Sequence, residues 1–249
     1  MKAMIFAAGL GTRLKPFTQH HPKALVEVAG VTMLERVIHR LADAGFRQIV
    51  INIHHFPEQI RQFLQAHNNF GLDIAISDET EQLLDTGGGI LHAQTLLDTD
   101  GAPFLVHNVD ILSDIDLQAL YRQHLASTAQ ASVLVAARDT QRYLLFDHAN
   151  RLHGWTNVQT GELRPEGLKP QSDWQKLAFQ GIHVISPSIF PRLREYAQTH
   201  SPAFSITNFY IDTCGDIDIR AAQPAQPYNW FDIGSPEKLQ RANDFFLKG

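Results

Sequence analysis

The stretch "FAAGLGTRLKPFTQHHPKALVEVAG", residues 6–30, decides how this chain is expected to fold and what its amino-terminal loop can bind. It begins at the end of a short apolar run, Lys2 to Phe6, which is typical of a buried first strand. The loop after that run carries two glycines, one arginine and two lysines, and no acidic residue lies between Lys2 and Glu27. A loop of this composition is expected to lie against an anion.

The glycine spacing of this loop excludes two common phosphate-binding motifs. The P-loop pattern is absent, and the third glycine of the dinucleotide fingerprint would fall at Leu14. Gly9 and Gly11 would still let the backbone approach a nucleotide and point amides at its phosphates. Arg13 offers a two-pronged contact to a polyphosphate, and Lys23 a mobile point charge. The alternative is a glycine turn with solvated basic residues and no ligand. The presence of Arg13, Pro16, Pro22 and Lys23 beside the two glycines favours phosphate binding over this alternative.

The first half of the chain alternates strand-like and helix-like patterns. Thr32 and Glu35 form a capping box before a helix whose end is marked by Gly45. Such alternation predicts a parallel sheet with helices on both faces, and ligands bind beyond the carboxyl ends of such strands. The further strands are expected at 48–53, 72–77 and 102–110, and the further helices at 57–68 and 86–97.

The second half predicts a smaller β region followed by mixed structure. We expect strands at 132–138, 177–186, 216–223 and 228–234, a hairpin over 142–157, and helices over 187–196, 204–214 and 235–247. No internal repeat or low-complexity segment divides the chain. The expectation is one domain over residues 1–249, with a first half at 1–112 and a second half at 113–249.

Composition narrows the possible partners. The chain has 249 residues, a formal net charge of -5 and a pI near 6.2, which argues against binding nucleic acid or an anionic membrane. Cys214 is the only cysteine, so an internal disulfide and a multi-cysteine metal site are excluded. No apolar run approaches the roughly 18 to 20 residues of a membrane span. These features predict a cytoplasmic protein.

From Met1 to Gly30 the sequence resembles the start of the sugar-1-phosphate nucleotidyltransferases, also called nucleotide-sugar pyrophosphorylases. The resemblance recurs in four later stretches: "DTGGGI" (85–90), "LVHNVD" (105–110), "LAFQGIHVIS" (177–186) and "WFDIGSPEKL" (230–239). It implies a Rossmann-like α/β/α sandwich of the nucleotide-diphospho-sugar transferase type. Such a fold has a predominantly parallel central sheet and a smaller sugar-binding β subregion.

Two carboxylates stand out independently of the resemblance. Asp110 follows the apolar stretch "FLVHN" and should lie at the ligand-binding edge, while Asp232 stands among aromatic and apolar residues, where an unpaired charge is costly. Two carboxylates that converge on a polyphosphate would hold Mg²⁺. The resemblance implies that these two aspartates are the metal ligands. The alternative is that Asp110 caps a turn and Asp232 pairs with an arginine.

The resemblance also implies which residues contact the substrates. Arg13, Lys23, Asp110 and Asp232 would be the catalytic residues, and Asn157 and Gly181 would contact the sugar. The nucleotide would be bound by nine residues: Ala7, Ala8, Gly9, Gly11, Thr12, Arg13, Lys23, Gly87 and Gly88. Val109 stands where the family usually has glycine, which puts the position of the sugar or ribose in doubt.

The implied reaction joins a nucleoside triphosphate to a sugar 1-phosphate and releases pyrophosphate. "TGGGI" and the closing "WFDIGSP" are most similar to bacterial N-acetylmuramate-1-phosphate uridylyltransferases of cell-wall recycling, so UTP is the expected nucleotide. The alternatives are mannose- or heptose-1-phosphate guanylyltransferases and glucose-1-phosphate uridylyl- or thymidylyltransferases. A binding module without turnover is the alternative of another class, favoured only by Val109. The expected assembly is a monomer or homodimer.

Other clusters carry less chemistry. The histidine pairs His20–His21 and His54–His55 have no companion ligands at metal spacing. Asp114 and Asp116 resemble the start of a calcium loop but lack its glycine and its closing glutamate. We expect the aspartates to mark the start of a helix instead.

Overall fold

The structure is a computed structural model that describes residues 1–247. Its strands are β1 (Lys2–Phe6), β2 (Glu27–Val28), β3 (Val31–Thr32), β4 (Gln48–Ile53), β5 (Asp73–Asp78), β6 (Phe104–Asn108), β7 (Ile111–Ser113), β8 (Ala131–Ala136), β9 (Arg142–Phe146), β10 (Leu152–Asn157), β11 (Glu162–Arg164), β12 (Gln175–Ile185), β13 (Ile219–Ala222) and β14 (Trp230–Asp232). Its helices are α1 (Met33–Asp43), α2 (Pro57–Ala66), α3 (Asp85–His92), α4 (Gln94–Leu97), α5 (Leu117–Leu125), α6 (Phe190–Thr199), α7 (Ile206–Thr213) and α8 (Pro236–Phe246). No helix within this part of the chain has the length and apolar character needed to cross a bilayer.

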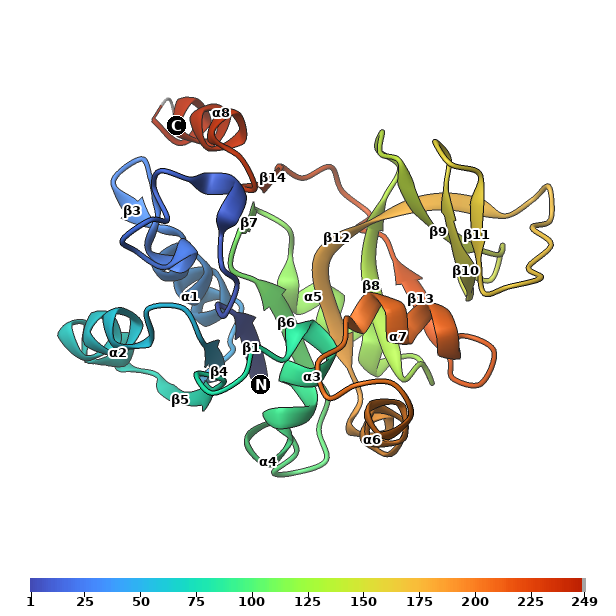
Figure 1. The fold of residues 1–249 in the computed structure, drawn as a ribbon, viewed down its shortest axis with the longest axis horizontal. Helices are drawn as coiled ribbons and strands as arrows, with labels where there is room; N and C mark the ends of the chain where they lie inside the picture. The colour runs from blue at the N-terminus through green and yellow to red at the C-terminus, as the bar shows by residue number, and fades with distance from the viewer. Residues whose placement is uncertain (248–249) are drawn as a thin grey trace.

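A ten-stranded sheet runs through the molecule in the order β11-β10-β9-β12-β6-β1-β4-β5, with β8 and β13 branching from β12 (Figure 1). The four strands of the amino-terminal part, β6, β1, β4 and β5, are all parallel. The long strand β12 runs antiparallel to β6, β8 and β9, and so joins the parallel part to the β9–β11 region. The predicted α/β fold with a mostly parallel central sheet and a smaller β region is confirmed.

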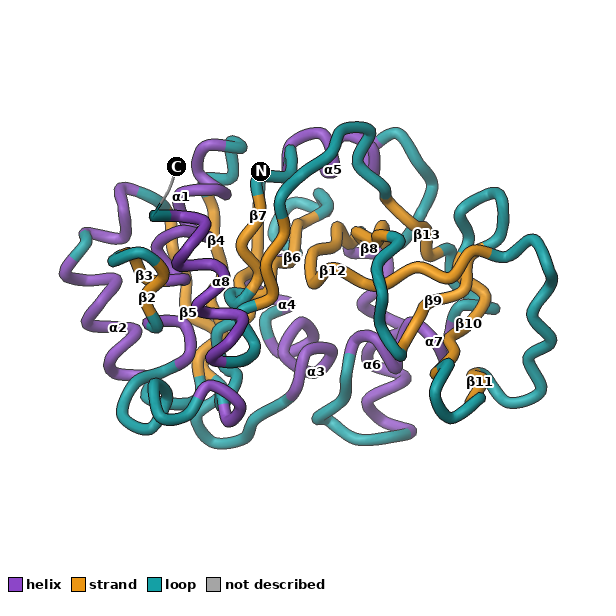
Figure 2. The backbone as a smooth tube through the Cα atoms, turned by 90° about the horizontal axis from the view of Figure 1, so that it is seen from above, coloured by secondary structure: helices purple, strands orange, loops and turns teal. Residues whose placement is uncertain are grey.

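Helices cover both faces of this sheet, which produces two hydrophobic cores. In β1, Ala3 and Ile5 point into one core and Met4 into the other, as expected for alternating side chains of a buried strand. The first core contains apolar residues of α1, α2, α5 and α8, and the second those of α3, α4, α6 and α7. Figure 2 shows α5 on one side of the strands and α3 and α6 on the other. The result is the predicted three-layer sandwich.

The ends of several helices follow the predicted signals. Thr32 Oγ1 accepts a hydrogen bond from the Glu35 amide at 3.2 Å, and Gly45 adopts a φ of +88° after α1. Asp116 accepts from the Ala119 amide at 2.8 Å, so it caps α5 as expected. The helix expected over residues 86–97 is instead divided into α3 and α4 around Ala93.

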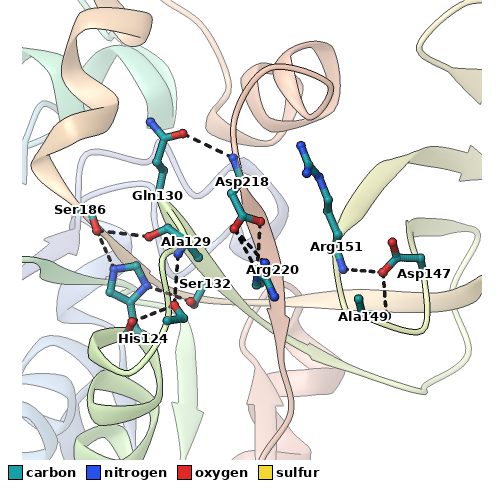
Figure 3. A network of polar contacts seen from close by, with 11 residues as sticks. His124, Ala129, Gln130, Ser132, Asp147, Ala149, Arg151, Ser186, Asp218 and Arg220 are labelled. Carbon is teal, nitrogen blue, oxygen red and sulfur yellow. Dashed lines mark hydrogen bonds and ion pairs between the residues drawn. The ribbon is translucent and has the colours of Figure 1, made fainter.

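A buried polar network holds the second half of the sheet to α5 (Figure 3). The ring of His124 contacts Ser132 Oγ of β8 at 2.8 Å and Ser186 Oγ, just after β12, at 2.9 Å. Burial lowers the pKa of His124 to about 4, so the ring is neutral at pH 7. Nearby, Asp218 and Arg220 form an ion pair at 3.0 Å next to β8. These contacts fix the relative positions of α5, β8 and β12.

Candidate active site

A cleft of about 320 Å³ opens at the carboxyl ends of β1, β4 and β6. The segments that follow β1, β5 and β6 all reach it, as predicted from their place in the sheet. Its lining residues come from these segments and their neighbours: Phe6, Ala7, Ala8, Gly9, Lys23, Asn52, Glu79, Leu83, Asp85, Thr86, Asn108, Val109 and Asp110. Five of the residues predicted to bind the nucleotide or metal therefore line one cleft.

A second cavity of about 360 Å³ continues from the cleft along the glycine-rich loop. Both are lined by Gly9, Lys23 and Leu83, so the two spaces adjoin. The second cavity is lined by the glycine-rich loop, by Lys23, and by two residues from later in the chain: Gly9, Leu10, Gly11, Thr12, Arg13, Leu14, Lys23, Leu83 and Gly234. Together the two cavities could hold a base with its ribose and an extended phosphate chain.

The two glycines of the loop differ in what they permit. Gly11 has a φ of +63°, and a Cβ there would lie 2.8 Å from the Thr18 methyl group. Thr18 also donates a hydrogen bond to the Gly11 carbonyl at 2.8 Å, which closes the turn. At Gly9 no atom lies within 4 Å of the position that a Cβ would take. Gly11 is therefore needed for the turn itself, whereas Gly9 keeps the cleft open to a ligand.

The two predicted metal ligands are brought together by the pairing of β7 with β14. Asp232 is in register with Ile111, the residue that follows Asp110. The Ile233 amide donates to the Asp110 carbonyl oxygen at 2.8 Å. Two aspartates far apart in the sequence thus lie on neighbouring backbone segments, and Asp110 lines the cleft.

Each of these aspartates is paired with a lysine. Lys23 forms an ion pair with Asp110, and Lys238 of α8 contacts Asp232 Oδ2 at 2.5 Å. A Cβ at Gly234 would lie 2.9 Å from Asp232 Oδ1 and 3.4 Å from Arg13 Nη2, so the Arg13 guanidinium is close to Asp232. Sequence reasoning missed Lys238, although its place in the first turn of the predicted last helix was a usable signal.

The donor set fits a magnesium ion. Mg²⁺ favours one or two carboxylates together with phosphate oxygens and water, and two aspartates lie on neighbouring backbone segments here. Within residues 1–247 no cluster of three or more His, Cys, Asp or Glu could hold a metal by protein groups alone. The remaining ligands would therefore have to come from substrate and solvent, with Asp110 and Asp232 as the protein ligands.

A buried network that the sequence analysis missed supports the cleft from behind. The Ala7 amide donates to Asn52 Oδ1 at 2.8 Å, and Asn52 Nδ2 donates to Glu79 Oε1 at 2.7 Å. Glu79 Oε2 accepts from the Leu84 amide at 3.2 Å. Burial raises the pKa of Glu79, against the opposing effect of the hydrogen bonds from Asn52 and Leu84. The network joins the ends of β1, β4 and β5 at the cleft.

Gly87 and Gly88, predicted to bind the nucleotide, are not among the residues that line the cleft. Both amides donate to the Phe204 carbonyl oxygen, at 2.8 and 3.2 Å, so neither is free for a base. A Cβ at Gly88 would lie 2.2 Å from the Pro202 carbonyl oxygen, and one at Gly87 would lie 2.3 Å from the Phe204 ring. These glycines allow α3 to pack against the segment before α7. Asp85 and Thr86, at the start of α3, line the cleft in their place.

The two predicted sugar-side residues differ in position. Asn157 ends β10, and its side chain accepts from the Gln159 amide at 3.0 Å in a hairpin turn, away from the residues that line the cleft. Gly181 has a φ of +75° where β12 is irregular, and a Cβ there would lie 3.0 Å from Asn108 Nδ2. Because Asn108 lines the cleft, Gly181 lies directly behind one of the cleft-lining residues.

The chain is similar to known proteins in both sequence and fold. The chain is 35% identical to N-acetylmuramate alpha-1-phosphate uridylyltransferase of Caulobacter vibrioides over 195 residues, 75% of this chain and 76% of that one. It is 36% identical to mannose-1-phosphate guanylyltransferase 1 of Arabidopsis thaliana over 211 residues, 74% of this chain and 58% of that one. The crystal structure of HddC from Yersinia pseudotuberculosis complexed with GMP-PN shares the fold, with a TM-score of 0.74 at 21% identity and coverage of 98% and 99% of the two chains.

The family comparison covers nearly the whole chain. The model of the family described as nucleotidyl transferase matches residues 2–249, which include both aspartates and the glycine-rich loop. The chain therefore belongs to the nucleotidyl transferase family.

Proposed function

We propose that this protein joins a nucleoside triphosphate to a sugar 1-phosphate, with UTP and N-acetylmuramate 1-phosphate as its substrates. A phosphate oxygen of the sugar phosphate would attack the α-phosphorus. A new P–O bond forms while the bond to the β-phosphate oxygen breaks, and pyrophosphate leaves with the electron pair. The observation that carries this proposal is the β7–β14 pairing, which brings the backbones of Asp110 and Asp232 together. Lys23 contacts Asp110, and Arg13 of the glycine-rich loop is close to Asp232, which supports the same arrangement.

The protein's own contribution would be positioning and charge neutralisation, because the phosphate monoester already carries the attacking charge. The open space at Gly9 would admit the phosphates against backbone amides. Arg13, which lines the loop cavity, would hold the leaving pyrophosphate, and Lys23, which lines both cavities, would balance charge near the α-phosphate. Mg²⁺ bound by Asp110 and Asp232 would supply further neutralisation of the reacting phosphates.

The two halves of the chain would divide the substrates between them. We assign the nucleotide to residues 1–112, which supply the whole lining of the cleft. The sugar falls to residues 113–249, which add Asp232 and the β9–β11 region. UTP and sugar phosphates are metabolites of the cytoplasm, where the reaction would take place.

A guanylyltransferase is the second candidate, and Glu79 is the observation that favours it. Its buried carboxylate lines the cleft and retains acceptor capacity beyond its hydrogen bonds with Asn52 and the Leu84 amide. The guanine edge presents two neighbouring N–H donors, whereas uracil presents one donor between two acceptors. The similarity to mannose-1-phosphate guanylyltransferase 1 of Arabidopsis thaliana is of the same order as that to the uridylyltransferase.

A matrix of triphosphates and sugar 1-phosphates, measured by Mg²⁺-dependent pyrophosphate release, tests the proposal. UTP with N-acetylmuramate 1-phosphate is expected to give the highest kcat/KM, and the Asp110→Asn variant provides the background. A preference for GTP would select the second candidate. Failure of every pair to release pyrophosphate above that background would refute the proposed reaction.

A further inference from the structure

A third cavity, of about 230 Å³, is lined by none of the residues of the cleft or the loop cavity. It lies where α1 meets β7, the end of β6 and the last turn of α8. Its polar lining consists of Arg36, His39, Arg40, His107 and Ser113, and no acidic residue is among the lining residues. The cavity is therefore positively charged.

The two arginines of this cavity have no carboxylate partner within residues 1–247. Arg36 donates through Nε and Nη2 to the Val28 carbonyl, at 3.1 and 2.5 Å, and its guanidinium stands 4.5 Å from the centre of the Phe246 ring. Arg40 Nη2 donates to the Ile115 carbonyl at 2.6 Å. Both side chains are partly buried, and their hydrogen bonds go to neutral carbonyl groups. Burial lowers the pKa of Arg36, which the nearby Glu35 carboxylate only partly offsets, so a bound anion would stabilise these cations.

Two buried polar atoms beside the cavity lack any partner in the described part of the chain, namely Arg40 Nε and Ser113 Oγ. An unsatisfied buried donor costs roughly 1–3 kcal/mol, so such atoms usually mark a water or ligand position. His107 adds a third polar atom. Its Nδ1 lies 2.8 Å from the Asn108 carbonyl oxygen and must carry the hydrogen, which leaves Nε2 as an acceptor.

We propose that this cavity binds a phosphate group, either as free phosphate or as part of a small metabolite. Arg40 and Arg36 would supply the charge, and Ser113 Oγ would donate to a phosphate oxygen. His107 Nε2 would accept from a protonated phosphate oxygen. The volume is below the roughly 300–1,000 Å³ of sites for drug-sized ligands, which excludes a whole nucleotide.

This cavity lies beside β7, which pairs with β14 next to the two aspartates. Ser113 ends β7, the strand that begins directly after Asp110, and it is in register with Trp230 of β14. A phosphate group bound in this cavity and hydrogen-bonded to Ser113 would thus contact the β7–β14 pair, at one end of which both aspartates lie, from outside the cleft.

Calorimetric titration with inorganic phosphate tests the site, in a background that removes the phosphate contact of the loop cavity. The Arg13→Gln variant is expected to bind about one equivalent of phosphate. Adding Arg40→Gln should weaken that binding at least tenfold, and Arg40→Lys, which keeps the charge and loses the fork, should weaken it less. Arg47→Gln, a change at an exposed arginine just beyond α1, is the matched control and should have no effect.

Two further measurements separate the proposal from a general effect of charge. Sulfate carries no proton near neutral pH, so the acceptor at His107 predicts that phosphate binds more tightly than sulfate. Ser113→Ala should weaken phosphate binding without lowering the melting temperature of the phosphate-free protein, because it removes an unsatisfied hydroxyl. Tighter binding of glycerol 3-phosphate than of inorganic phosphate would identify a metabolite as the source, and the reverse would identify the free ion.

The proposal is overturned if the Arg13→Gln variant shows no saturable phosphate binding. It is equally overturned if folded Arg40→Gln and Arg40→Lys variants, checked by circular dichroism, bind phosphate as the parent does.

Discussion

Asp110 and Asp232 are neighbours only because two short strands pair, and each carries its own lysine. Lys23 forms an ion pair with Asp110 and Lys238 with Asp232, so the charge of each carboxylate is balanced by an ammonium group. When a metal ion binds the aspartates, each lysine would leave its aspartate and contact a phosphate of the substrate instead. The roles of the four side chains can be separated by substitution.

Asp110→Asn and Asp232→Asn are each expected to lower pyrophosphate release by at least a hundredfold, because each loses the charge that would bind Mg²⁺. The melting temperature should change little. Asp73→Asn is the matched control, since Asp73 is exposed at the amino end of β5, the opposite edge of the sheet. Near-normal turnover in Asp110→Asn would remove that residue from the metal site.

Glu79→Gln tests the network behind the cleft. The amide group of Gln would face either Asn52 Nδ2 or the Leu84 amide with a donor, so one hydrogen bond is lost and two donors oppose each other. The expected cost is about 1–3 kcal/mol of unfolding free energy, with a raised KM for the nucleotide and a smaller change in kcat. Urea unfolding and steady-state kinetics measure both; an unchanged KM would show that Glu79 does not position the nucleotide site.

At the scale of single elements, the glycines of this chain serve two purposes that sequence patterns do not separate. Gly9 stands in open space at the cleft, whereas Gly88 is in contact with the Pro202 carbonyl. Both belong to glycine-rich stretches at the start of a loop or helix. Only the packing of α3 against the segment before α7 shows which of them faces a ligand.

Gly88→Ala and Gly9→Ala form a matched pair of substitutions. Gly88→Ala should destabilise the protein by about 1–3 kcal/mol or more, because the new methyl group would overlap backbone atoms. Gly9→Ala should leave the melting temperature nearly unchanged and weaken nucleotide binding, since its methyl group would enter the cleft. Thermal unfolding and nucleotide titration of the two variants give the comparison; the opposite assignment of effects would show that Gly88, not Gly9, faces the nucleotide.

Much of the element pattern was predictable because it depends on local signals. The strand Lys2–Phe6, the capped helix after Thr32 and the proline-started helix α8 all follow from short-range patterns. The antiparallel direction of β12 was not predicted, because a buried apolar run carries no sign of its orientation. The division of residues 86–97 into α3 and α4 was also not predicted, because no proline or other helix-ending residue marks the break at Ala93.

Candidate site residues could be named from the sequence only where a motif carried them. Asp110, Asp232, Arg13 and Lys23 lie in stretches that resemble a known family. In the structure Asp110 and Lys23 line the cleft, Arg13 lines the adjoining loop cavity, and Asp232 lies near Arg13. Asn52, Glu79 and Lys238 were missed because their importance depends on contacts between distant strands and helices. Asn157 was placed by a loose resemblance alone, and its side chain is used in a hairpin turn instead.

At the scale of the whole molecule, two cores hold the sheet rigid and leave the site at its edge. Three histidines are buried, and burial lowers their pKa values, to about 4 for His107 and His124 and about 3 for His183. In the unfolded chain a histidine titrates near 6.5. Each therefore remains neutral in the fold at pH values where the unfolded chain binds a proton.

This difference predicts acid destabilisation that begins at mildly acidic pH. Stability should be full above about pH 6.5 and fall toward pH 4, by up to about 1.4 kcal/mol per pH unit for each histidine. Glu79, whose pKa is raised by burial, acts in the opposite direction and reduces the slope. Urea unfolding between pH 8 and 5 measures how steeply the unfolding free energy depends on pH. His124→Gln should reduce this slope. His148→Gln, a change at a histidine whose side chain is 84% exposed, is the control and should leave the slope unchanged. A flat profile would mean that these rings take up protons in the fold.

The location of the metal tests the central claim most directly. Crystals grown with Mn²⁺ in place of Mg²⁺ and a non-hydrolysable UTP analogue would show the ion by its anomalous scattering. We predict one Mn²⁺ about 2.1 Å from a carboxylate oxygen of Asp110, equally close to one of Asp232, and in contact with the phosphate chain. An ion bound elsewhere, with both aspartates still on Lys23 and Lys238, would contradict the account.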